Sequence, residues 1–261
     1  NILGKKRNVF LGGNVKGQAT LPLLKKIKSG DIVVMELDSW RLQGFHDLKI
    51  SPHISVFTSF MSDHMNYYGN DIKRYFEDKA NIFKYHKKDD FLILGRQFLT
   101  GVKKLGLYKS FNDFKKETQG KIILSNKKDI PENWKIKILG EHNLENIAAA
   151  LAVCRVLKVK ERIIKKTITS FKGIPGRLEF IKEIKGVKFY NDTTATTPEG
   201  TIAALSAFKN YKGKIILIGG GSDKNLDYKE YAEIVKKYVK ALILFSGSAS
   251  DKIIKELKIK E

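Results

Sequence analysis

The sequence predicts an α/β protein: a mostly parallel sheet with flanking helices, followed by a smaller Rossmann-like domain. Short apolar runs rich in β-branched residues alternate with helical patterns along most of the chain. A Gly- and Pro-containing stretch at 172–176 interrupts this alternation and is typical of a domain boundary. The chain has 261 residues, enough for two domains. We therefore expect a first domain over residues 1–172 and a second over residues 173–261.

The first domain is expected to contain five strands and three helices. The strand at 31–37 (DIVVMEL) has the continuous apolar character of a strand buried on both faces. Residues 140–143 (GEHN) precede an Ala-rich helical pattern, which suits close packing. The expected strands are 8–11, 31–37, 53–57, 91–94 and 121–124, and the expected helices are 71–85, 144–157 and 160–170.

The second domain is organised around residues 187–208. A strand at 187–190, expected to be buried in a parallel sheet, leads through the polar loop 191–197 into a helix. Thr197 suits the N-cap and Pro198 the first helical position. Polar residues at the carboxyl end of a parallel strand indicate a ligand site, although a well-capped connection without chemistry has the same pattern. Strands at 214–218 and 241–245 and helices at 228–238 and from 250 follow.

Composition narrows the class of protein. The net charge is +21, but only seven of the 49 basic residues are Arg, and the Lys residues are scattered along the chain. That distribution is typical of a solvated surface that attracts anionic small molecules, and we expect no nucleic-acid partner. The single cysteine, Cys154, excludes a disulfide framework and favours the cytoplasm. No apolar run is long enough to span a bilayer, so no membrane insertion is expected.

Three residues could carry chemistry in the first domain. Glu36 closes a strand, His64 lies in a loop after a strand, and Lys79 lies in a predicted helix. Each has an ordinary structural interpretation, but a carboxylate and an imidazole at strand ends together resemble a site for a hard cation such as Mg²⁺. Gly12 and Gly13 could let the backbone approach a ligand closely. The G-x-x-x-x-G-K-[ST] phosphate loop is absent from the sequence.

Seven blocks of sequence, in this order, resemble the Mur ligase family. They are GGNVKG, MELDSWRL, SDHMNYYG followed by EDKANIF, LGEHNLENIAAA, GIPGRLEF, NDTTATTPEGTIAAL and IGGGSDKNLD. NDTTATTP discriminates best and points to the members that add D-glutamate. The resemblance implies most of a central ATP-binding domain and the first part of a C-terminal Rossmann-like domain. Because the chain does not begin with Met, we expect a fragment. The resemblance implies that it lacks the UDP-binding domain, the phosphate-binding loop and the C-terminal end.

The resemblance also implies a reaction. The carboxylate of UDP-N-acetylmuramoyl-L-alanine would attack the γ-phosphate of ATP to give an acyl phosphate, which the amine of D-glutamate would then displace. ATP and Mg²⁺ are the implied cofactors, a monomer is the implied state, and peptidoglycan synthesis is the implied process. By position in the matching motifs, the implied Mg²⁺ ligands are Glu36, His64 and Lys79, the last as a carbamate.

Further roles follow from the same motifs. The implied nucleotide contacts are Asn143, Asn146, Arg177 and Asp192. Asn14 and Ser39 would lie near the muramoyl-alanine substrate, and Thr196 and Lys224 near D-glutamate. The chain departs from the family pattern at Thr194, where a lysine is frequent, at Lys16 in the GGN loop, and at Asp38, Trp40 and Arg41.

Two other classes of function remain open. One is an amide ligase of the same superfamily that adds another amino acid or extends a folate polyglutamate. The other is a non-catalytic nucleotide-binding module, which the missing phosphate loop favours for these 261 residues taken alone. A nucleic-acid binder is a weaker alternative than these two, because the basic residues are not clustered.

Overall fold

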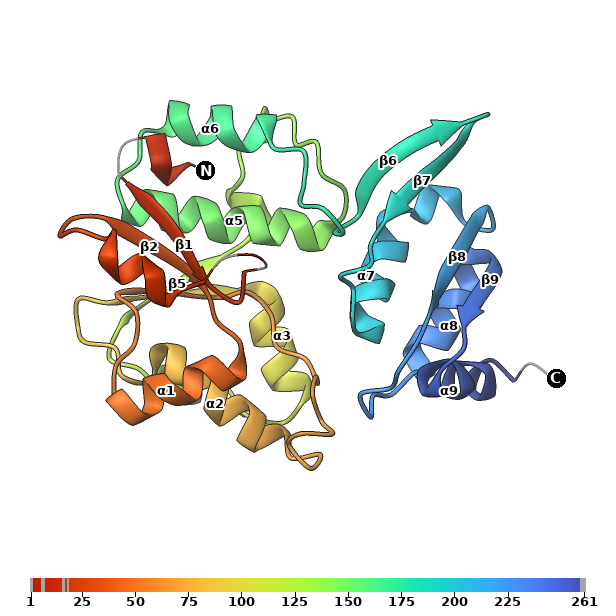
Figure 1. Cartoon of the computed structure of the whole chain (residues 1–261), viewed down its shortest axis with the longest axis horizontal. Helices are drawn as coiled ribbons and strands as arrows, with labels where there is room; N and C mark the ends of the chain where they lie inside the picture. Colours follow the sequence, from red (N-terminus) through yellow and green to blue (C-terminus); the bar gives the residue numbers. More distant parts are fainter. Residues whose placement is uncertain (1, 6–7, 16, 18, 259–261) are drawn as a thin grey trace. The chain divides into compact units, whose positions relative to one another are not determined.

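The computed structural model describes residues 2–5, 8–15, 17 and 19–258 (Figure 1). Lys16, one of the departures from the family pattern, lies outside these residues. The chain forms two compact units. The first comprises residues 1–60, 72–136 and 145–170, and the second comprises residues 61–71, 137–144 and 171–261. Within the described ranges, no helix is long and apolar enough to cross a membrane.

Parallel strands and helices form the first unit, as the sequence predicts for an α/β protein. Strands β1 and β2 pair in parallel, and β3, β4 and β5 form a second parallel sheet in that order. The strands are β1 Val9–Gly13, β2 Ile32–Glu36, β3 Ile54–Phe57, β4 Phe91–Gly95 and β5 Lys121–Ser125. The helices are α1 Ser39–Leu48, α2 Ile72–Lys84, α3 Arg96–Lys104, α4 Phe111–Lys115, α5 Glu141–Val156 and α6 Glu161–Ser170, with short 3₁₀ turns at Leu3–Lys5, Leu21–Lys25 and Lys127–Asp129. The first turn of α5, residues 141–144, belongs to the second unit.

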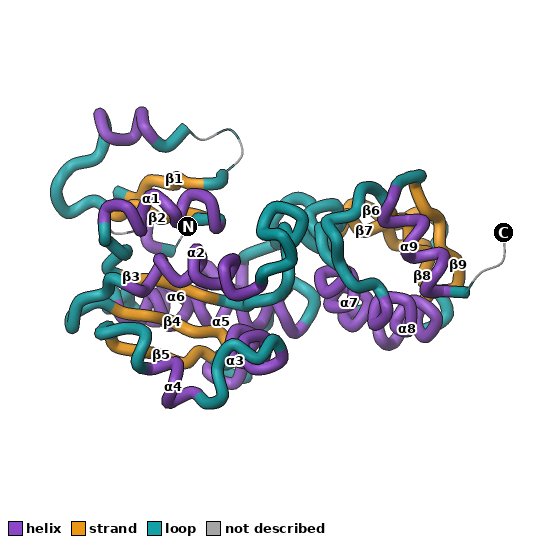
Figure 2. The backbone as a smooth tube through the Cα atoms, turned by 90° about the horizontal axis from the view of Figure 1, so that it is seen from below, coloured by secondary structure: helices purple, strands orange, loops and turns teal. Residues whose placement is uncertain are grey.

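Helices cover both faces of the first unit's strands. Figures 1 and 2 show α5 and α6 on one side and α1, α2 and α3 on the other. Phe83 of α2, Phe98 of α3 and three consecutive β4 residues, Leu92, Ile93 and Leu94, are fully buried. The continuous apolar run of β4 is what a strand covered on both faces requires.

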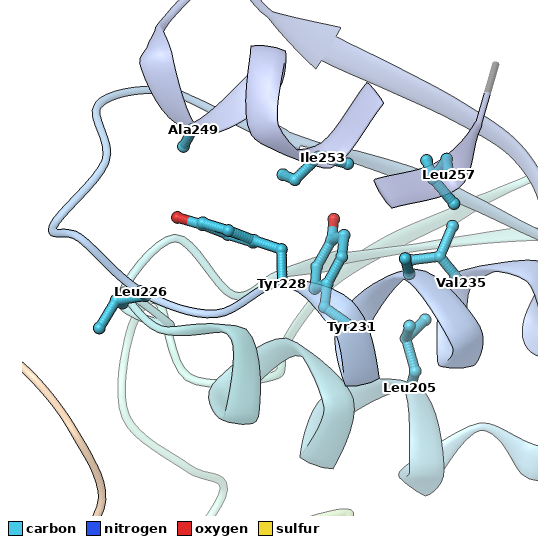
Figure 3. Close-up of a cluster of buried hydrophobic side chains, with 9 residues drawn as sticks. Leu205, Leu226, Tyr228, Tyr231, Val235, Ala249, Ile253 and Leu257 are labelled. Atoms are coloured by element: carbon cyan, nitrogen blue, oxygen red, sulfur yellow. The ribbon is translucent and has the colours of Figure 1, made fainter. Parts of the chain in front are cut away.

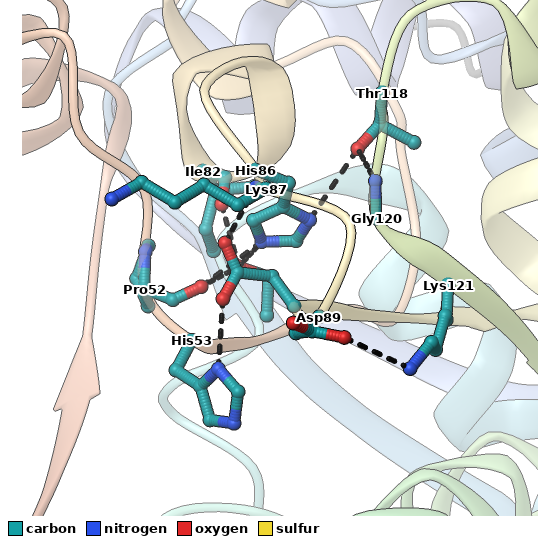
Figure 4. A network of polar contacts seen from close by, with 11 residues as sticks. Pro52, His53, Ile82, His86, Lys87, Asp89, Thr118, Gly120 and Lys121 are labelled. Carbon is teal, nitrogen blue, oxygen red and sulfur yellow. Dashed lines mark hydrogen bonds and ion pairs between the residues drawn. The ribbon is translucent and has the colours of Figure 1, made fainter.

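A buried histidine joins the end of α2 to the starts of two strands (Figure 4). His86 is 3% exposed, and its Nε2 lies 2.9 Å from Ser55 Oγ and 3.0 Å from the Pro52 carbonyl oxygen. Its Nδ1 lies 3.4 Å from Thr118 Oγ1. Burial lowers the pKa of His86 and so favours the neutral ring.

The second unit contains one antiparallel and one parallel pair of strands. β6 Glu179–Ile184 and β7 Val187–Asn191 are antiparallel, whereas β8 Ile215–Gly220 and β9 Val239–Phe245 are parallel. The helices are α7 Pro198–Ala207, α8 Lys229–Tyr238 and α9 Ser248–Leu257, with a 3₁₀ turn at Lys209–Tyr211. Side chains from α7, α8, α9 and the segment before α8 form its core, among them Leu205, Tyr231, Val235 and Ile253 (Figure 3).

Two expectations about burial are wrong. The strand at 187–190 was expected to be buried in a parallel sheet, but β7 pairs antiparallel with β6, and Val187 is 55% exposed. The strand at 31–37 was expected to be buried on both faces, but Val34 of β2 is 42% exposed. An apolar run predicts burial only where helices or further strands cover both faces, and each of these strands pairs with a single neighbour among the described residues.

Candidate active site

A loop of the second unit holds the first group of candidate residues. Residues 61–71 follow β3 in sequence and belong to the second unit. Asp63 Oδ1 lies 3.1 Å from Lys224 Nζ, and Asp63 Oδ2 lies 3.4 Å from His64 Nε2. Lys224 Nζ also lies 3.5 Å from Thr196 Oγ1. The structure thus brings together Thr196, Lys224 and His64, three residues predicted for substrate and metal, around one carboxylate.

Asp63 is a residue that the motif analysis did not select. Its carboxylate accepts a hydrogen bond of 2.8 Å from the backbone N–H of His64, a residue that has the left-handed φ of +55°. The only sequence signal for Asp63 is its place beside His64 in SDHM. The ammonium of Lys224 pairs with it and lies close to the hydroxyl of Thr196, and these two groups can both donate to a carboxylate ligand.

The N-terminus of α7 confirms the predicted cap. Thr197 Oγ1 accepts a hydrogen bond from the Gly200 N–H at 3.3 Å, and Pro198 occupies the first helical turn. Thr197 Oγ1 also lies 3.7 Å from Met61 Sδ, so the cap contacts the loop that carries Asp63. Thr197, the last residue of the polar loop 191–197, therefore contacts both helix α7 and the 61–71 loop.

A second group gathers around Asp192. The Leu178 N–H donates to Asp192 Oδ1 at 2.9 Å. Burial raises the pKa of Asp192, while this hydrogen bond and the charges of Arg177 and His142 oppose the rise. Burial lowers the pKa of His142, with Asp192 raising it and Arg177 lowering it further. The predicted nucleotide residues Arg177 and Asp192 therefore interact electrostatically, together with a histidine that the motif analysis missed.

The start of α5 carries the two predicted asparagines. Asn143 Nδ2 donates to the Leu139 carbonyl at 2.7 Å, which orients its amide. Asn146 is exposed and lies three positions further along the same helix, so both side chains are on one helical face. Gly140 precedes the helix with φ +93°, and a Cβ there would lie 2.5 Å from the His142 ring. Only glycine suits this conformation.

In the first unit, the carboxyl ends of β1 and β2 place Asn14 beside Glu36. The backbone N–H of Asn14 donates to the Glu36 carbonyl at 2.7 Å, and Gly13 pairs with Glu36 in register. Gly13 has φ +82°, and a Cβ there would lie 2.0 Å from the Glu36 carbonyl oxygen. Gly13 thus allows a close approach between two strands, and the Glu36 side chain is exposed at the strand end.

Ser39 and its neighbours begin α1. Asp38 is the N-cap, and its carboxylate accepts a hydrogen bond from the Arg41 N–H at 2.9 Å and pairs with the Arg41 guanidinium. Two of the departures from the family pattern therefore contact each other locally. Ser39 is 2% exposed, and its Oγ has no hydrogen-bond partner among the described residues. A buried hydroxyl without a partner is costly.

Lys79 lies in the middle of α2 on the side of the helix that carries Tyr75. Its Nζ is 5.2 Å from the centre of the Tyr75 ring, a cation–π distance, and Tyr75 is 4% exposed. The adjacent Asp78 accepts a hydrogen bond of 2.7 Å from Gln43 Nε2, which fixes α2 against α1. Tyr75 is a further neighbour of the site that the motif analysis did not select.

Within residues 2–5, 8–15, 17 and 19–258, acidic, histidine and cysteine side chains alone form no metal centre. In the part of the chain that the structure describes, no three of these side chains lie close enough to hold an ion. Glu36 and Lys79 belong to the first unit and His64 to the second, so the predicted magnesium site stays a prediction. The donor types are compatible with Mg²⁺, which takes one or two carboxylates and completes its shell with water and phosphate oxygens.

Comparison with known proteins gives the class of this fold and site. Residues 12–154 match the Mur ligase middle domain, and residues 176–261 match the Mur ligase glutamate ligase domain. A MurF from Acinetobacter baumannii has a similar fold, with a TM-score of 0.74 at 16% identity over 99% of this chain and 62% of that one. A MurF ligase from Thermotoga maritima, solved in complex with ADP, has a TM-score of 0.67 at 21% sequence identity, over 98% of this chain and 74% of that one. The chain belongs to the Mur ligase family, which confirms the resemblance.

Curated proteins that are similar in sequence to this chain carry the name of one member of the family. UDP-N-acetylmuramoylalanine–D-glutamate ligase from Clostridioides difficile is 31% identical over 94% of this chain and 56% of its own length. The enzyme of the same name from Acetivibrio thermocellus is 34% identical over 95% of this chain and 54% of its own length. The chain thus spans about half the length of the curated relatives it matches.

Proposed function

We propose that the protein forms an amide bond between UDP-N-acetylmuramoyl-L-alanine and D-glutamate at the expense of ATP, in peptidoglycan synthesis. The names of the relatives support this substrate pair. The observation that carries the proposal is the cluster of Lys224, Thr196 and Asp63, because an ammonium and a hydroxyl together suit a dicarboxylate amino acid. The same cluster includes His64, which the motifs assign to the reaction centre.

The proposed reaction has two steps. The muramoyl-alanine carboxylate attacks the γ-phosphorus of ATP, so that ADP leaves and an acyl phosphate forms. The amine of D-glutamate then attacks the acyl carbon, and inorganic phosphate leaves with the electron pair of the broken C–O bond. Such steps depend mostly on positioning and on charge neutralisation. Asn14 and Ser39 would position the muramoyl-alanine substrate, and Thr196 and Lys224 the amino acid.

The nucleotide is proposed to contact Asn143, Asn146, Arg177 and Asp192. Arg177 would neutralise phosphate charge, and the half-buried Asp192 would accept hydrogen bonds from the nucleoside. We assign residues 1–172 to a central ATP-binding domain and residues 173–261 to a C-terminal Rossmann-like domain. Glu36, His64 and a carbamylated Lys79 would hold Mg²⁺, which supplies charge neutralisation at the phosphates when bound.

The setting follows from the chemistry of the substrates. ATP and a nucleotide-linked precursor are cytoplasmic metabolites, so we place the reaction in the cytoplasm and assign no nucleic-acid partner. We expect the protein to act as a monomer, the state that the family resemblance implies.

Phosphate release tests the proposal. The protein expressed from its complete gene is given ATP, Mg²⁺ and UDP-N-acetylmuramoyl-L-alanine, first with D-glutamate and then with other amino acids in turn. Release that requires D-glutamate supports the proposal. Release with another amino acid, or with a folate substrate, moves the specificity within the superfamily. No release with any acceptor refutes the enzyme and favours a nucleotide-binding module.

Lys224→Met sharpens this test. Loss of the ammonium should raise the KM for D-glutamate about tenfold or more, because a charge-assisted contact is lost. Lys240→Met is the matched control, since Lys240 is exposed on β9. An equal effect of the two substitutions would show that only the net charge of the surface matters, and would remove Lys224 from the site.

A further inference from the structure

The backbone around Arg177 adopts a tight, strained turn. The Arg177 N–H donates to the Ile174 carbonyl at 3.1 Å. On either side of Arg177, the backbone is left-handed: Gly176 has φ +75° and Leu178 has φ +44°. A left-handed conformation is unfavourable for leucine, so the surrounding contacts must hold it.

Hydrogen bonds hold both residues that flank Arg177. The Gly176 N–H donates to Glu179 Oε2 at 2.9 Å. The Gly176 carbonyl accepts from the N–H of Thr194 at 3.1 Å and from its Oγ1 at 2.5 Å. The Leu178 N–H is bound by Asp192, as described above. The turn is therefore attached to the loop 191–197 on both sides of Arg177.

Glu179 connects these contacts through a single carboxylate. It is the first residue of β6 and pairs in register with Asn191, the last residue of β7. Its Oε2 also lies 3.4 Å from Asn191 Nδ2, while Asn191 Oδ1 accepts from the Thr193 N–H at 3.1 Å. A carboxylate that accepts from a backbone N–H forms a stronger hydrogen bond than a neutral acceptor does. Neither the motif analysis nor the proposed function gives Glu179 a role.

We propose that Glu179 is a positioning residue, which fixes the Gly176–Leu178 turn so that Arg177 is presented to the phosphates of the nucleotide. This inference rests on the proposed function, because that function places Arg177 at the nucleotide. Glu179 acts on the nucleotide only through the backbone of the turn and the guanidinium of Arg177. It lies two positions after Arg177 in the sequence and needs no direct contact with ATP.

The first measurement is hydrogen exchange of backbone amides in this chain. Glu179→Ala should speed the exchange of the Gly176 amide, because it removes the acceptor of that N–H. It should also speed the exchange of the Thr194 amide, because the Gly176 carbonyl that accepts from Thr194 is then held less firmly. Glu179→Gln keeps an oxygen that can accept from Gly176 and should preserve the protection. Glu183→Ala, an exposed position on the same strand, is the matched control. Unchanged exchange in Glu179→Ala would overturn the proposal.

The second measurement is ATP affinity in the protein from the complete gene, with Mg²⁺ present. Glu179→Ala should weaken binding about tenfold, and Glu179→Gln by much less. In an Arg177→Ala background, Glu179→Ala should add almost nothing, because the two residues act in series. Additive losses would overturn the proposal, since they would show that Glu179 acts independently of Arg177.

The two measurements separate the inference from the function beneath it. If the wild-type protein binds no ATP, the proposed function fails, and the claim that Glu179 positions Arg177 for the nucleotide fails with it. If ATP binds normally and Glu179→Ala changes neither its affinity nor amide exchange, the inference fails and the proposed function stands.

Discussion

Gly13→Ala should destabilise the end of the β1–β2 pair, because the added Cβ would make a close contact with Glu36. A Cβ at position 13 would lie 2.0 Å from the Glu36 carbonyl oxygen, 2.9 Å from its carbonyl carbon and 3.0 Å from its nitrogen. Backbone atoms cannot move aside as a flexible side chain can. The two strands must separate, which also breaks the hydrogen bond from the Asn14 N–H to Glu36.

Three contributions give the magnitude. The left-handed φ of +82° costs a residue with a Cβ about 1–2 kcal/mol. Forcing atoms into a packed site costs about 1–3 kcal/mol, and one lost backbone hydrogen bond about 1 kcal/mol. The free energy of unfolding should therefore fall by about 3–6 kcal/mol. Gly30→Ala isolates the first contribution, because Gly30 has φ +89° but no atom within 4 Å of the added Cβ.

Urea unfolding of this chain, followed by circular dichroism, measures both variants. We expect Gly30→Ala to lose about 1–2 kcal/mol from its backbone conformation alone. Equal losses in the two variants would refute the reasoning, because they would show that the β1–β2 approach carries no steric cost. A loss in Gly13→Ala below about 2 kcal/mol would have the same meaning.

Three further predictions concern ionisable groups. Since burial lowers the pKa of His86, the unfolded chain binds more protons than the folded chain below about pH 6.5, and the free energy of unfolding should fall as the pH decreases through that range. Urea titrations from pH 8 to 5 should show this decrease, and His86→Gln should make it smaller. Burial raises the pKa of Cys154 to about 11, so a thiol reagent at pH 8 should label it quickly only after denaturation, and fast labelling of the native chain would contradict its burial. Asp63→Asn removes the ion-pair partner that holds the ammonium of Lys224 in place, so the KM for the amino acid substrate should rise about tenfold. An unchanged or lower KM would show that Asp63 does not position Lys224 for the substrate.

Local signals in the sequence predicted most of the helices and strands. β4, α7 and α8 agree with the expected ranges to within two residues, because strong apolar periodicity and the Thr197–Pro198 cap mark them. α1 was not predicted, since its apolar residues do not lie on one clear face of the helix. β6 was also missed, because charged and apolar residues mix in it and most of its side chains are exposed.

The partners of the candidate site residues could not be read from the sequence. Motifs selected His64, Thr196 and Lys224, but Asp63, which links two of them, lies 161 positions from Lys224. His142 likewise entered the site through its electrostatic interaction with Asp192 and Arg177. Such contacts depend on how loops from distant parts of the chain meet, and periodicity carries no information about that.

The sequence by itself determined the family, the alternation of strands and helices, and the residue types available for chemistry, since these depend on local patterns and short blocks of residues. The tertiary structure decided which of those residues touch. It turned the 187–191 strand into half of an exposed hairpin, attached the residues that flank Arg177 to Glu179, Thr194 and Asp192, and placed Asp63 between a lysine and a histidine. The physical reason is that hydrogen bonds and charges act over a few ångströms in space, however far apart the residues lie along the chain.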